Sequence, residues 1–384
     1  MKKIMILQIK SNSCGGIWFV NETLSNEFKK NNYEVFVLSI RKNPGPIVIN
    51  ENQSFKMYTI NEKDLWEITR LSSIKKELKT FKFLKAFKEI FKKINDEIKL
   101  KKDYRKAKKI IRNYNPNYII SSHYQLFEAI PKEYLSKVIM HQHTSFDATL
   151  KEQPKAIKTF NKYKDKIAKF VWLTKATCND AIKFGYKNSI CIYNPTKFTS
   201  TKIADVINNK KLITMSRLNS YEKRIDLMLE IANDVLKKHK DWTLELYGAD
   251  KLNDDCMRIV NSNKQIKLMG NSLNVKKDLL SSSIYLSTSS YEGFSLSIGE
   301  AYECGVPCVC YYFGEPTTER IIDGKTGFII PFNNKSLYEE KLLYLMEKEK
   351  TLLNMSKEAK KMAKNFYPDI IIKEWVELFN SIKG

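Results

Sequence analysis

The 384-residue sequence predicts an α/β protein built from two doubly wound domains that face each other across a cleft. Short apolar runs rich in β-branched residues recur along the chain, and stretches with helical periodicity or turns separate them. This alternation is typical of a parallel sheet with crossover helices. The pattern occurs twice, and the second series begins after Tyr193-Asn194-Pro195. Two such sheets would place a ligand at the carboxyl ends of their strands, in the cleft between the domains.

The expected strands follow the chain in order. The first series comprises Ile4–Ile9, Glu34–Ile40, Tyr118–Ser121, Val138–His141 and Phe170–Leu173. The second series comprises Leu212–Met215, Thr243–Tyr247, Ile266–Met269, Ile284–Ser287, Cys308–Tyr312 and Gly327–Ile330. The two series are of similar length and join near residues 195–210, so the expected domain boundary lies there.

The N-terminus and the cysteines bear on the compartment. The run Met1–Ile9 is interrupted by Gln8 and followed at once by Lys10, so it predicts a buried first strand rather than a signal peptide. We find no apolar run long enough to span a bilayer. The seven cysteines are odd in number and lack Cys-x-x-Cys spacing, which favours neither a disulfide framework nor a zinc knuckle. We expect a cytoplasmic protein.

The charge balance points to an anionic partner. The chain has 66 Lys and Arg against 43 Asp and Glu, a formal net charge of +23. Residues 74–113 concentrate this charge, with 16 basic and five acidic residues. Apolar residues recur there at three- and four-residue spacing, which predicts an amphipathic basic helix. This helix is either a solvated element packed on its own domain or a contact with an anionic membrane surface; a nucleic-acid arm lacks any accompanying recognition module.

The most specific segment runs from Ser290 to Pro307. It reads as a strand end, a glycine turn and then a helix, with Glu292 in the turn and Glu300 within the helix. The free backbone N–H groups of Gly293, Phe294 and Ser295 would open this helix and present a positive dipole end to a phosphate or a sugar oxygen.

A second segment, Ile213–Leu227, supplies cations. Arg217 comes directly after an expected strand, and Lys223 lies at the start of the following helix. Such a pair of cations would absorb the charge of an anionic ligand without metal.

Together these motifs resemble the retaining family 4 glycosyltransferases, which have the GT-B fold of two Rossmann-like domains. The resemblance lies in Glu-Gly-Phe…Gly-Glu-Ala with seven residues between Glu292 and Glu300, in the following Gly-Val-Pro, and in the downstream stretch from Glu319 to Ile330. It is strongest over residues 212–332. The resemblance implies that Arg217 and Lys223 bind the diphosphate. Because Lys223 follows Arg217 by six residues where five is commoner, Arg224 is an alternative to Lys223.

The same resemblance extends to the N-terminal half. It implies that Gly15 and Gly16 form a loop facing donor and acceptor, although an ordinary tight turn explains two glycines equally well. It also implies that His143 reaches the donor sugar, with His141 as the alternative. A metal site at these histidines has no evident third ligand beyond Asp147, so we expect none.

Two further assignments complete the resemblance. Met269 and Gly270 resemble the loop whose backbone contacts the nucleobase, and Tyr367–Ile382 resembles the C-terminal helix that crosses back onto the N-terminal domain. The expected domains are therefore an acceptor-binding domain at 1–195, a donor-binding domain at 196–366 and a crossing helix at 367–384.

The resulting hypothesis is a metal-independent, retaining glycosyltransferase without a cofactor. It would move a hexose or N-acetylhexosamine from a nucleotide sugar, with uridine diphosphate as the expected carrier, to a lipid-linked glycan or a teichoic-acid-like polymer. Its expected place is the inner face of the cell membrane, reached through residues 74–113. A nucleotide-sugar 2-epimerase on the same scaffold and a nucleic-acid-binding protein are the alternatives; the sugar, the acceptor hydroxyl and the oligomeric state stay open.

Overall fold

The structure is a computed structural model that describes residues 1–11, 15–42, 55–61 and 83–382, with only the backbone at 83–87 and 89. The chain divides into two compact units. Unit 1 comprises Met1–Gln142, Pro154–Val171 and Val376–Gly384, and unit 2 comprises His143–Gln153 and Trp172–Trp375. Cys14 and residues 74–82 of the predicted basic helix lie outside the described residues.

The first sheet has seven strands in the order β3-β2-β1-β4-β5-β6-β7, and most of it lies in unit 1. Its strands are β1 (Lys3–Ser11), β2 (Glu34–Lys42), β3 (Lys56–Asn61), β4 (Tyr118–Ser121), β5 (Val138–His141), β6 (Lys169–Trp172) and β7 (Ser189–Cys191). Strands β1 to β6 pair in parallel. The order reverses between β1 and β4, which makes the sheet doubly wound.

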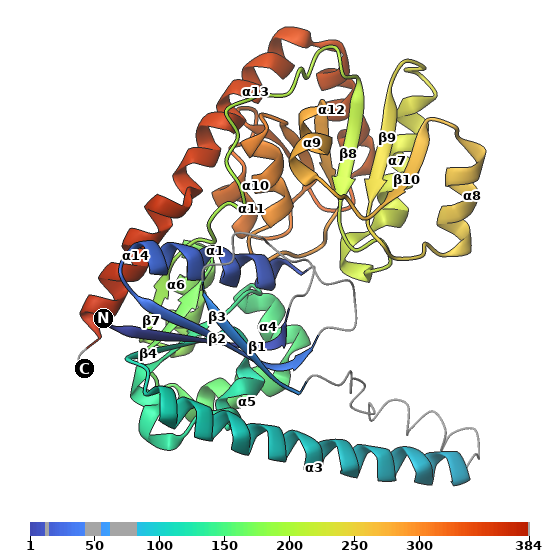
Figure 1. Cartoon of the computed structure of the whole chain (residues 1–384). Coiled ribbons are helices and arrows are strands. Elements are labelled where there is room, and N and C mark those ends of the chain that lie inside the picture. The colour runs from blue at the N-terminus through green and yellow to red at the C-terminus, as the bar shows by residue number, and fades with distance from the viewer. Residues whose placement is uncertain (12–14, 43–54, 62–82, 383–384) are drawn as a thin grey trace. The chain divides into compact units, whose positions relative to one another are not determined.

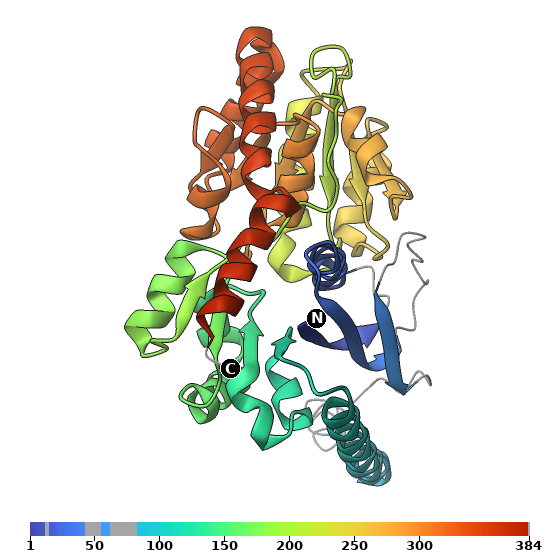
Figure 2. The ribbon, with the colours of Figure 1, turned by 60° about the vertical axis from the view of Figure 1, so that its left-hand side comes forward.

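Helices flank this sheet. They are α1 (Gly16–Lys30), α3 (Phe83–Tyr114), η1 (Tyr124–Ala129), η2 (Lys132–Lys137) and α5 (Pro154–Tyr163). Helix α1 connects β1 to β2, and helix α3 connects β3 to β4 on the other side of β1, so the two connections run in opposite directions across the sheet. Because such connections are right-handed, the two helices lie on opposite faces of the sheet (Figure 1). The amino-terminal part of α3 extends beyond the sheet in both views (Figures 1 and 2).

The second sheet has six strands in the order β10-β9-β8-β11-β12-β13 and lies in unit 2. Its strands are β8 (Lys211–Met215), β9 (Thr243–Tyr247), β10 (Ile266–Gly270), β11 (Ile284–Ser287), β12 (Cys308–Tyr311) and β13 (Gly327–Ile330). All of their pairings are parallel, and every residue of β11 and β12 is buried. Burial on both faces explains why these strands read as continuous apolar runs.

The other helices belong wholly or mainly to unit 2. They are α4 (Phe146–Glu152), α6 (Lys175–Phe184), η3 (Tyr221–Lys223), α7 (Ile225–Leu236), α8 (Asp254–Ser262), α9 (Val275–Leu280), α10 (Leu296–Glu303), α11 (Pro316–Arg320), α12 (Lys335–Glu347), α13 (Glu349–Ala363), η4 (Lys364–Phe366) and α14 (Pro368–Ser381). The end of α14 belongs to unit 1, where the Phe379 ring stacks on Tyr118 at a centroid distance of 4.4 Å.

The predicted fold class of two doubly wound α/β sheets is confirmed. Each predicted apolar run is a strand, with ends that shift by no more than two residues. Strands β3 and β7 were missed, because β3 is a partly exposed edge strand and β7 has three residues. The predicted domain limits at 195 and 366 fall between elements, whereas the compact units divide the chain differently, so these limits stay a prediction.

The described cysteines are all free, and five of the six are buried. Among the residues that the structure describes, no helix combines the length and apolarity needed to cross a membrane.

Candidate active site in unit 2

Three of the predicted site residues, Arg217, Lys223 and Glu292, lie where the strand order of the second sheet reverses. Strands β8 and β11 are neighbours, yet β8 continues toward β9 and β11 continues toward β12 on the other side. The loops that follow the two strands therefore diverge and leave space at their carboxyl ends, where doubly wound sheets bind ligands. The first of these loops carries Arg217 and Lys223, and the second carries Glu292.

Lys223 and Glu292 meet at this switch point. The Lys223 Nζ atom lies 2.5 Å from Glu292 Oε1, and each side chain retains 16% of its exposure. Ser289 Oγ donates a second hydrogen bond to the same oxygen at 2.9 Å. The Thr288 hydroxyl donates to the carbonyls of Lys223 and Arg224, at 2.8 and 2.9 Å, and so ties the two loops together. A cation and a carboxylate are thereby held side by side within reach of solvent.

Arg217 forms a second ion pair in the same pair of loops. Its Nη2 atom lies 2.5 Å from Glu222 Oε1, and 71% of the Arg217 side chain is exposed while Glu222 is nearly buried. The Glu222 carbonyl accepts a hydrogen bond from the Ser290 N–H at 2.8 Å. The guanidinium has five N–H groups, so one pairing leaves donors for an anion.

Arg224 is oriented differently from Lys223. It adopts the left-handed conformation at φ 48°, at the start of α7. Its Nε atom lies 3.3 Å from Asp226 Oδ1, its Nη1 atom donates to Asn333, and its guanidinium lies over the Phe332 ring. Of the two alternatives, Lys223 is therefore the one beside Glu292.

The turn after Glu292 requires a glycine. A Cβ atom at Gly293 would lie 2.2 Å from the carbonyl oxygen of His143 and 3.5 Å from Leu173 Cδ1. The backbones of Gly293 and His143 consequently touch, which brings the predicted donor histidine next to the glutamate turn. Phe294 then packs against Tyr193 and Phe366, at centroid distances of 5.2 and 5.1 Å, and anchors this turn in a buried aromatic cluster.

The helix after the turn begins at Leu296. Ser295 is buried and left-handed at φ 43°, and its side chain forms no cap hydrogen bond to α10. The backbone N–H groups in the first turn of α10 therefore have no side-chain cap from this residue.

Glu300 projects from the middle of α10 and is half-buried. Burial raises the pKa of its carboxyl group, and the charges of Lys197 and Arg320 partly oppose this rise. The Arg320 side chain is 2% exposed, and its guanidinium carbon lies 4.4 Å from the Phe294 ring centroid and 4.6 Å from that of Phe366. Burial lowers the pKa of Arg320 to about 10. A buried cation thus lies beside the helix that carries Glu300.

Gly299 makes room for this arginine. A Cβ atom at position 299 would overlap the Arg320 guanidinium, so only glycine leaves space for it. The sequence interpretation missed Arg320 and Glu222, since a lone basic or acidic residue is no signal in a chain with so many charges.

Other predicted donor residues lie further along the second sheet. Met269 and Gly270 end β10 and are exposed, and the Gly270 carbonyl accepts a hydrogen bond from the Gly248 N–H at 2.8 Å. Their role toward the nucleobase stays a prediction.

The remaining candidates, Gly15, Gly16 and His141, lie in unit 1. Gly15 precedes α1 and Gly16 begins it, at the carboxyl end of β1. His141 is buried at the end of β5. His123 accepts a hydrogen bond from the Gln125 N–H at 3.2 Å and caps η1, and burial lowers its pKa to about 4. The loop role predicted for Gly15 and Gly16 stays a prediction.

Among the described residues, no group of three or more His, Cys, Asp or Glu side chains is arranged to hold a metal ion. The neighbouring histidines and Asp147 thus form no such group. Metal independence and the lack of a cofactor stay predictions.

Comparison with known proteins relates this geometry to a family. Residues 198–362 match the family model described as Glycosyl transferases group 1. An uncharacterized glycosyltransferase of Haemophilus influenzae is 25% identical over 385 residues, which cover 98% of this chain and 99% of the relative.

Two further similarities involve Staphylococcus aureus. A poly(ribitol-phosphate) alpha-N-acetylglucosaminyltransferase is 27% identical over 258 residues, covering 63% of this chain and 50% of that relative. The crystal structure of a TarM mutant with fondaparinux, alpha-GlcNAc-glycerol and UDP superposes with a TM-score of 0.74 at 16% identity, covering 99% of this chain and 100% of that one. The chain therefore has the GT-B fold, and the match of residues 198–362 to group 1 glycosyl transferases supports a glycosyltransferase.

Proposed function

We propose that the protein is a retaining glycosyltransferase that moves a hexose or N-acetylhexosamine from a nucleotide sugar to a cell-surface polymer or lipid-linked glycan. One observation carries this proposal. Lys223, Glu292 and Arg217 come together at the switch point of the second sheet, within the segment that matches group 1 glycosyl transferases.

The cations serve the leaving group in this proposal. As the bond to the sugar breaks, negative charge develops on the diphosphate, and preorganised donors lower the barrier by stabilising it. Arg217 and Lys223 supply that stabilisation, because each reaches solvent and carries N–H groups beyond its present ion pair. The backbone N–H groups of Phe294 and Ser295, before α10, assist them.

The carboxylates serve recognition. Glu292 accepts hydrogen bonds from hydroxyls of the transferred sugar. Lys223 and Ser289 hold its carboxylate at the switch point through Oε1. Glu300 holds the two hydroxyls of the ribose, because a carboxylate accepts two parallel hydrogen bonds from a diol. His143, whose backbone touches Gly293, reaches the donor sugar.

The acceptor attacks on the face from which the diphosphate departs, and a phosphate oxygen takes the acceptor's proton. The proton then leaves with the diphosphate, so charge and atoms balance without a protein base. This route needs no pair of carboxylates of the glycosidase kind, and neither metal nor cofactor.

We propose a UDP-sugar donor and a phosphate-containing polymer or glycan acceptor. The support comes from relatives: the TarM structure holds UDP and alpha-GlcNAc-glycerol, and the S. aureus relative is named for poly(ribitol phosphate). Met269 and Gly270 contribute backbone contacts to the nucleobase, and Gly15 and Gly16 form a loop toward donor and acceptor. The protein works in the cytoplasm at the inner face of the membrane, which residues 74–113 contact.

A panel of nucleotide sugars tests this proposal. The matching donor should raise the Tm of the protein, and it should be consumed only when an acceptor glycan or polyol-phosphate fragment is present. Glu292→Gln and Arg217→Ala should each abolish most of the transfer. Unchanged turnover in both variants would remove the site assignment.

Two other outcomes would replace the proposed reaction. Release of a free epimerised sugar without any acceptor would identify a 2-epimerase. Binding of nucleic acid with a steep salt dependence, without any nucleotide-sugar binding, would identify a nucleic-acid-binding protein. Retention of the anomeric configuration, read from the product by NMR, separates retaining from inverting transfer.

A further inference from the structure

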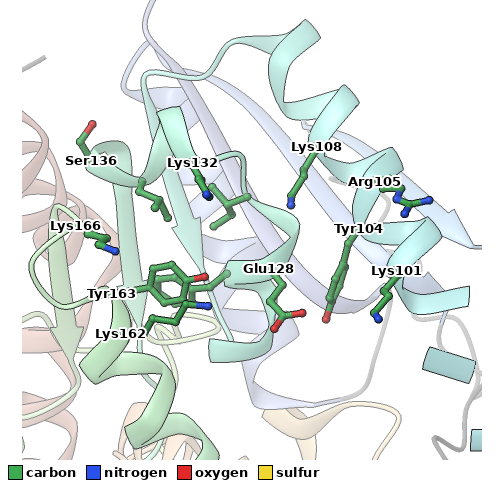
Figure 3. A pocket seen from close by; sticks show the side chains of 13 residues that line it. Lys101, Tyr104, Arg105, Lys108, Glu128, Lys132, Ser136, Lys162, Tyr163 and Lys166 are labelled. Atoms are coloured by element: carbon green, nitrogen blue, oxygen red, sulfur yellow. The ribbon is translucent and has the colours of Figure 1, made fainter. Parts of the chain in front are cut away.

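Unit 1 contains a basic pocket that the proposed transfer reaction does not use. The pocket has a volume of about 880 Å³ and lies between α3, η1, η2 and the end of α5 (Figure 3). Six cationic side chains line it, namely Lys101, Arg105, Lys108, Lys132, Lys162 and Lys166, and its one carboxylate is Glu128. Glu292, Arg217, Lys223 and His143 lie in unit 2, and the unit 1 candidates Gly15, Gly16 and His141 do not line this pocket, so it is a separate feature.

The pocket carries more positive than negative charge, since Glu128 is the one carboxylate among its lining residues. None of these six cations forms an ion pair with a carboxylate among the residues that the structure describes. Part of the wall is aromatic: Tyr163 stacks on Phe127 at a centroid distance of 5.0 Å, and Lys162 Nζ lies 5.0 Å from the centroid of the Tyr163 ring. Like charges held together in a concave site repel one another and bind an anion that relieves this repulsion.

The pocket wall continues into an exposed apolar stripe on α3. Ile90, Ile94 and Ile98 follow one another at spacings of four, and Lys101, Arg105 and Lys108 continue the row at spacings of three and four. Residues at these spacings lie on one face of a helix. This stripe is exposed, with 36% exposure at Ile90 and 49% at both Ile94 and Ile98.

The adjoining face of α3 covers its own unit, and its Tyr104 also lines the pocket. Ala107 and Ile111 are fully buried there, and the hydroxyl of buried Tyr104 donates to the Gln125 carbonyl at 3.1 Å. Packing among the described residues of unit 1 therefore does not account for the isoleucine stripe. An apolar row that leads into a cluster of cations along one helix is the pattern of helices that lie in a membrane interface.

We propose that this pocket binds the phosphate groups of anionic membrane lipids while Ile90, Ile94 and Ile98 enter the acyl boundary. This inference deepens the proposed membrane contact and rests on it. The proposed membrane contact is then a defined headgroup site formed by α3, η2 and α5, rather than a diffuse electrostatic attraction by residues 74–113. The stripe favours lipid over a dissolved polyphosphate, because a dissolved anion gives the isoleucines nothing to contact.

Vesicle flotation of the full chain tests the site. The pocket variant carries Lys101→Gln, Arg105→Gln and Lys108→Gln. Vesicles of phosphatidylcholine with phosphatidylglycerol should bind the wild type, and the pocket variant should partition at least about tenfold less at equal lipid. Circular dichroism and Tm show whether the variant is folded.

The same helix provides a matched control. Lys102→Gln, Lys106→Gln and Lys109→Gln remove an equal charge from exposed residues of α3 that do not line the pocket. This control variant should retain most of the vesicle binding. Equal losses in the two variants would show diffuse electrostatics and overturn the headgroup site, as would an unaffected pocket variant.

Two further arms identify the ligand. Ile94→Gln with Ile98→Gln should weaken vesicle binding and leave the binding of inorganic polyphosphate unchanged. If the pocket variant lost polyphosphate or nucleic-acid binding but kept its vesicle binding, the occupant would be a soluble polyanion and the lipid proposal would be wrong. Transfer to a soluble acceptor fragment should persist in the same variants. If the wild type also showed no transfer, the proposed function would be contradicted rather than the lipid site.

Discussion

Lys223 and Glu292 form an ion pair between the two loops that diverge at the switch point of the second sheet, with Nζ 2.5 Å from Oε1. Both side chains are partly exposed, so the ion pair holds two charged groups in place and leaves them accessible to a ligand. When a nucleotide-sugar donor binds here, the contact between Lys223 and Glu292 is replaced by contacts of Lys223 with the diphosphate and of Glu292 with the sugar.

Lys223→Ala should lower kcat/KM for transfer by about 10²–10³, because it removes a cation from the developing diphosphate charge. Arg224→Ala, one residue away, is the matched control and should have little effect, since Asp226 and Asn333 engage that guanidinium. Steady-state kinetics with the matching nucleotide sugar measure both variants. The reverse ranking would assign the diphosphate to Arg224.

Gly293→Ala should impair both folding stability and transfer. Its methyl group would lie 2.2 Å from the His143 carbonyl oxygen, and a backbone atom cannot move aside as a side chain can. We expect a loss of about 1–3 kcal/mol in the free energy of unfolding. Gly324→Ala is the comparison: it has φ +70° and open space around its Cβ, so it should cost only about 1–2 kcal/mol and leave kcat unchanged. A fully active Gly293→Ala enzyme would contradict the close approach.

Glu300→Gln should gain thermal stability relative to wild type as the pH rises. The pKa of the folded carboxyl group is raised by burial, so the native state binds more protons than the unfolded chain between the two pKa values. Stability of the wild type therefore falls as pH rises through this interval, and the amide escapes this loss. Differential Tm measurements at about pH 4.5 and about pH 8 check the sign. Donor binding should weaken in the same variant, which separates its binding role from its cost to stability.

The buried pair of Glu303 and Lys360 should be among the most sensitive positions for stability. Glu303 is fully buried at the end of α10, and Lys360 Nζ lies 2.5 Å from its Oε1. The carboxylate also accepts from the Ser200 N–H and the Tyr367 hydroxyl. Lys360→Met leaves this carboxylate uncompensated and should cost about 3–5 kcal/mol.

The exposed Lys151–Asp147 pair is the control for this effect. Both of its side chains are 69% exposed, so Lys151→Ala should change stability by less than about 1 kcal/mol. Urea unfolding of the two variants compares the pairs, and equal costs would show that the Glu303 pair is not buried in solution.

The pattern of apolar runs determined the fold class. Strands such as β11 and β12 are buried on both faces, so they occur as continuous apolar runs in the sequence. The alternation of these runs with helices indicates a parallel sheet. The short strand β7 and the edge strand β3 carry no such signal, because few of their residues are buried. The resemblance of their segments to family 4 glycosyltransferases likewise predicted Glu292, Glu300, Arg217 and Lys223 from the sequence.

Only the tertiary structure decided which side chains meet. Lys223 and Arg224 are neighbours in sequence, and the left-handed turn at Arg224 sends one toward Glu292 and the other toward Asp226. The contact of Gly293 with His143 joins residues far apart in the chain, and the pocket around Glu128 draws cations from three elements. Local conformational preferences and motif spacing can be read from a sequence. Contacts between distant residues depend on how the packed sheets position their loops.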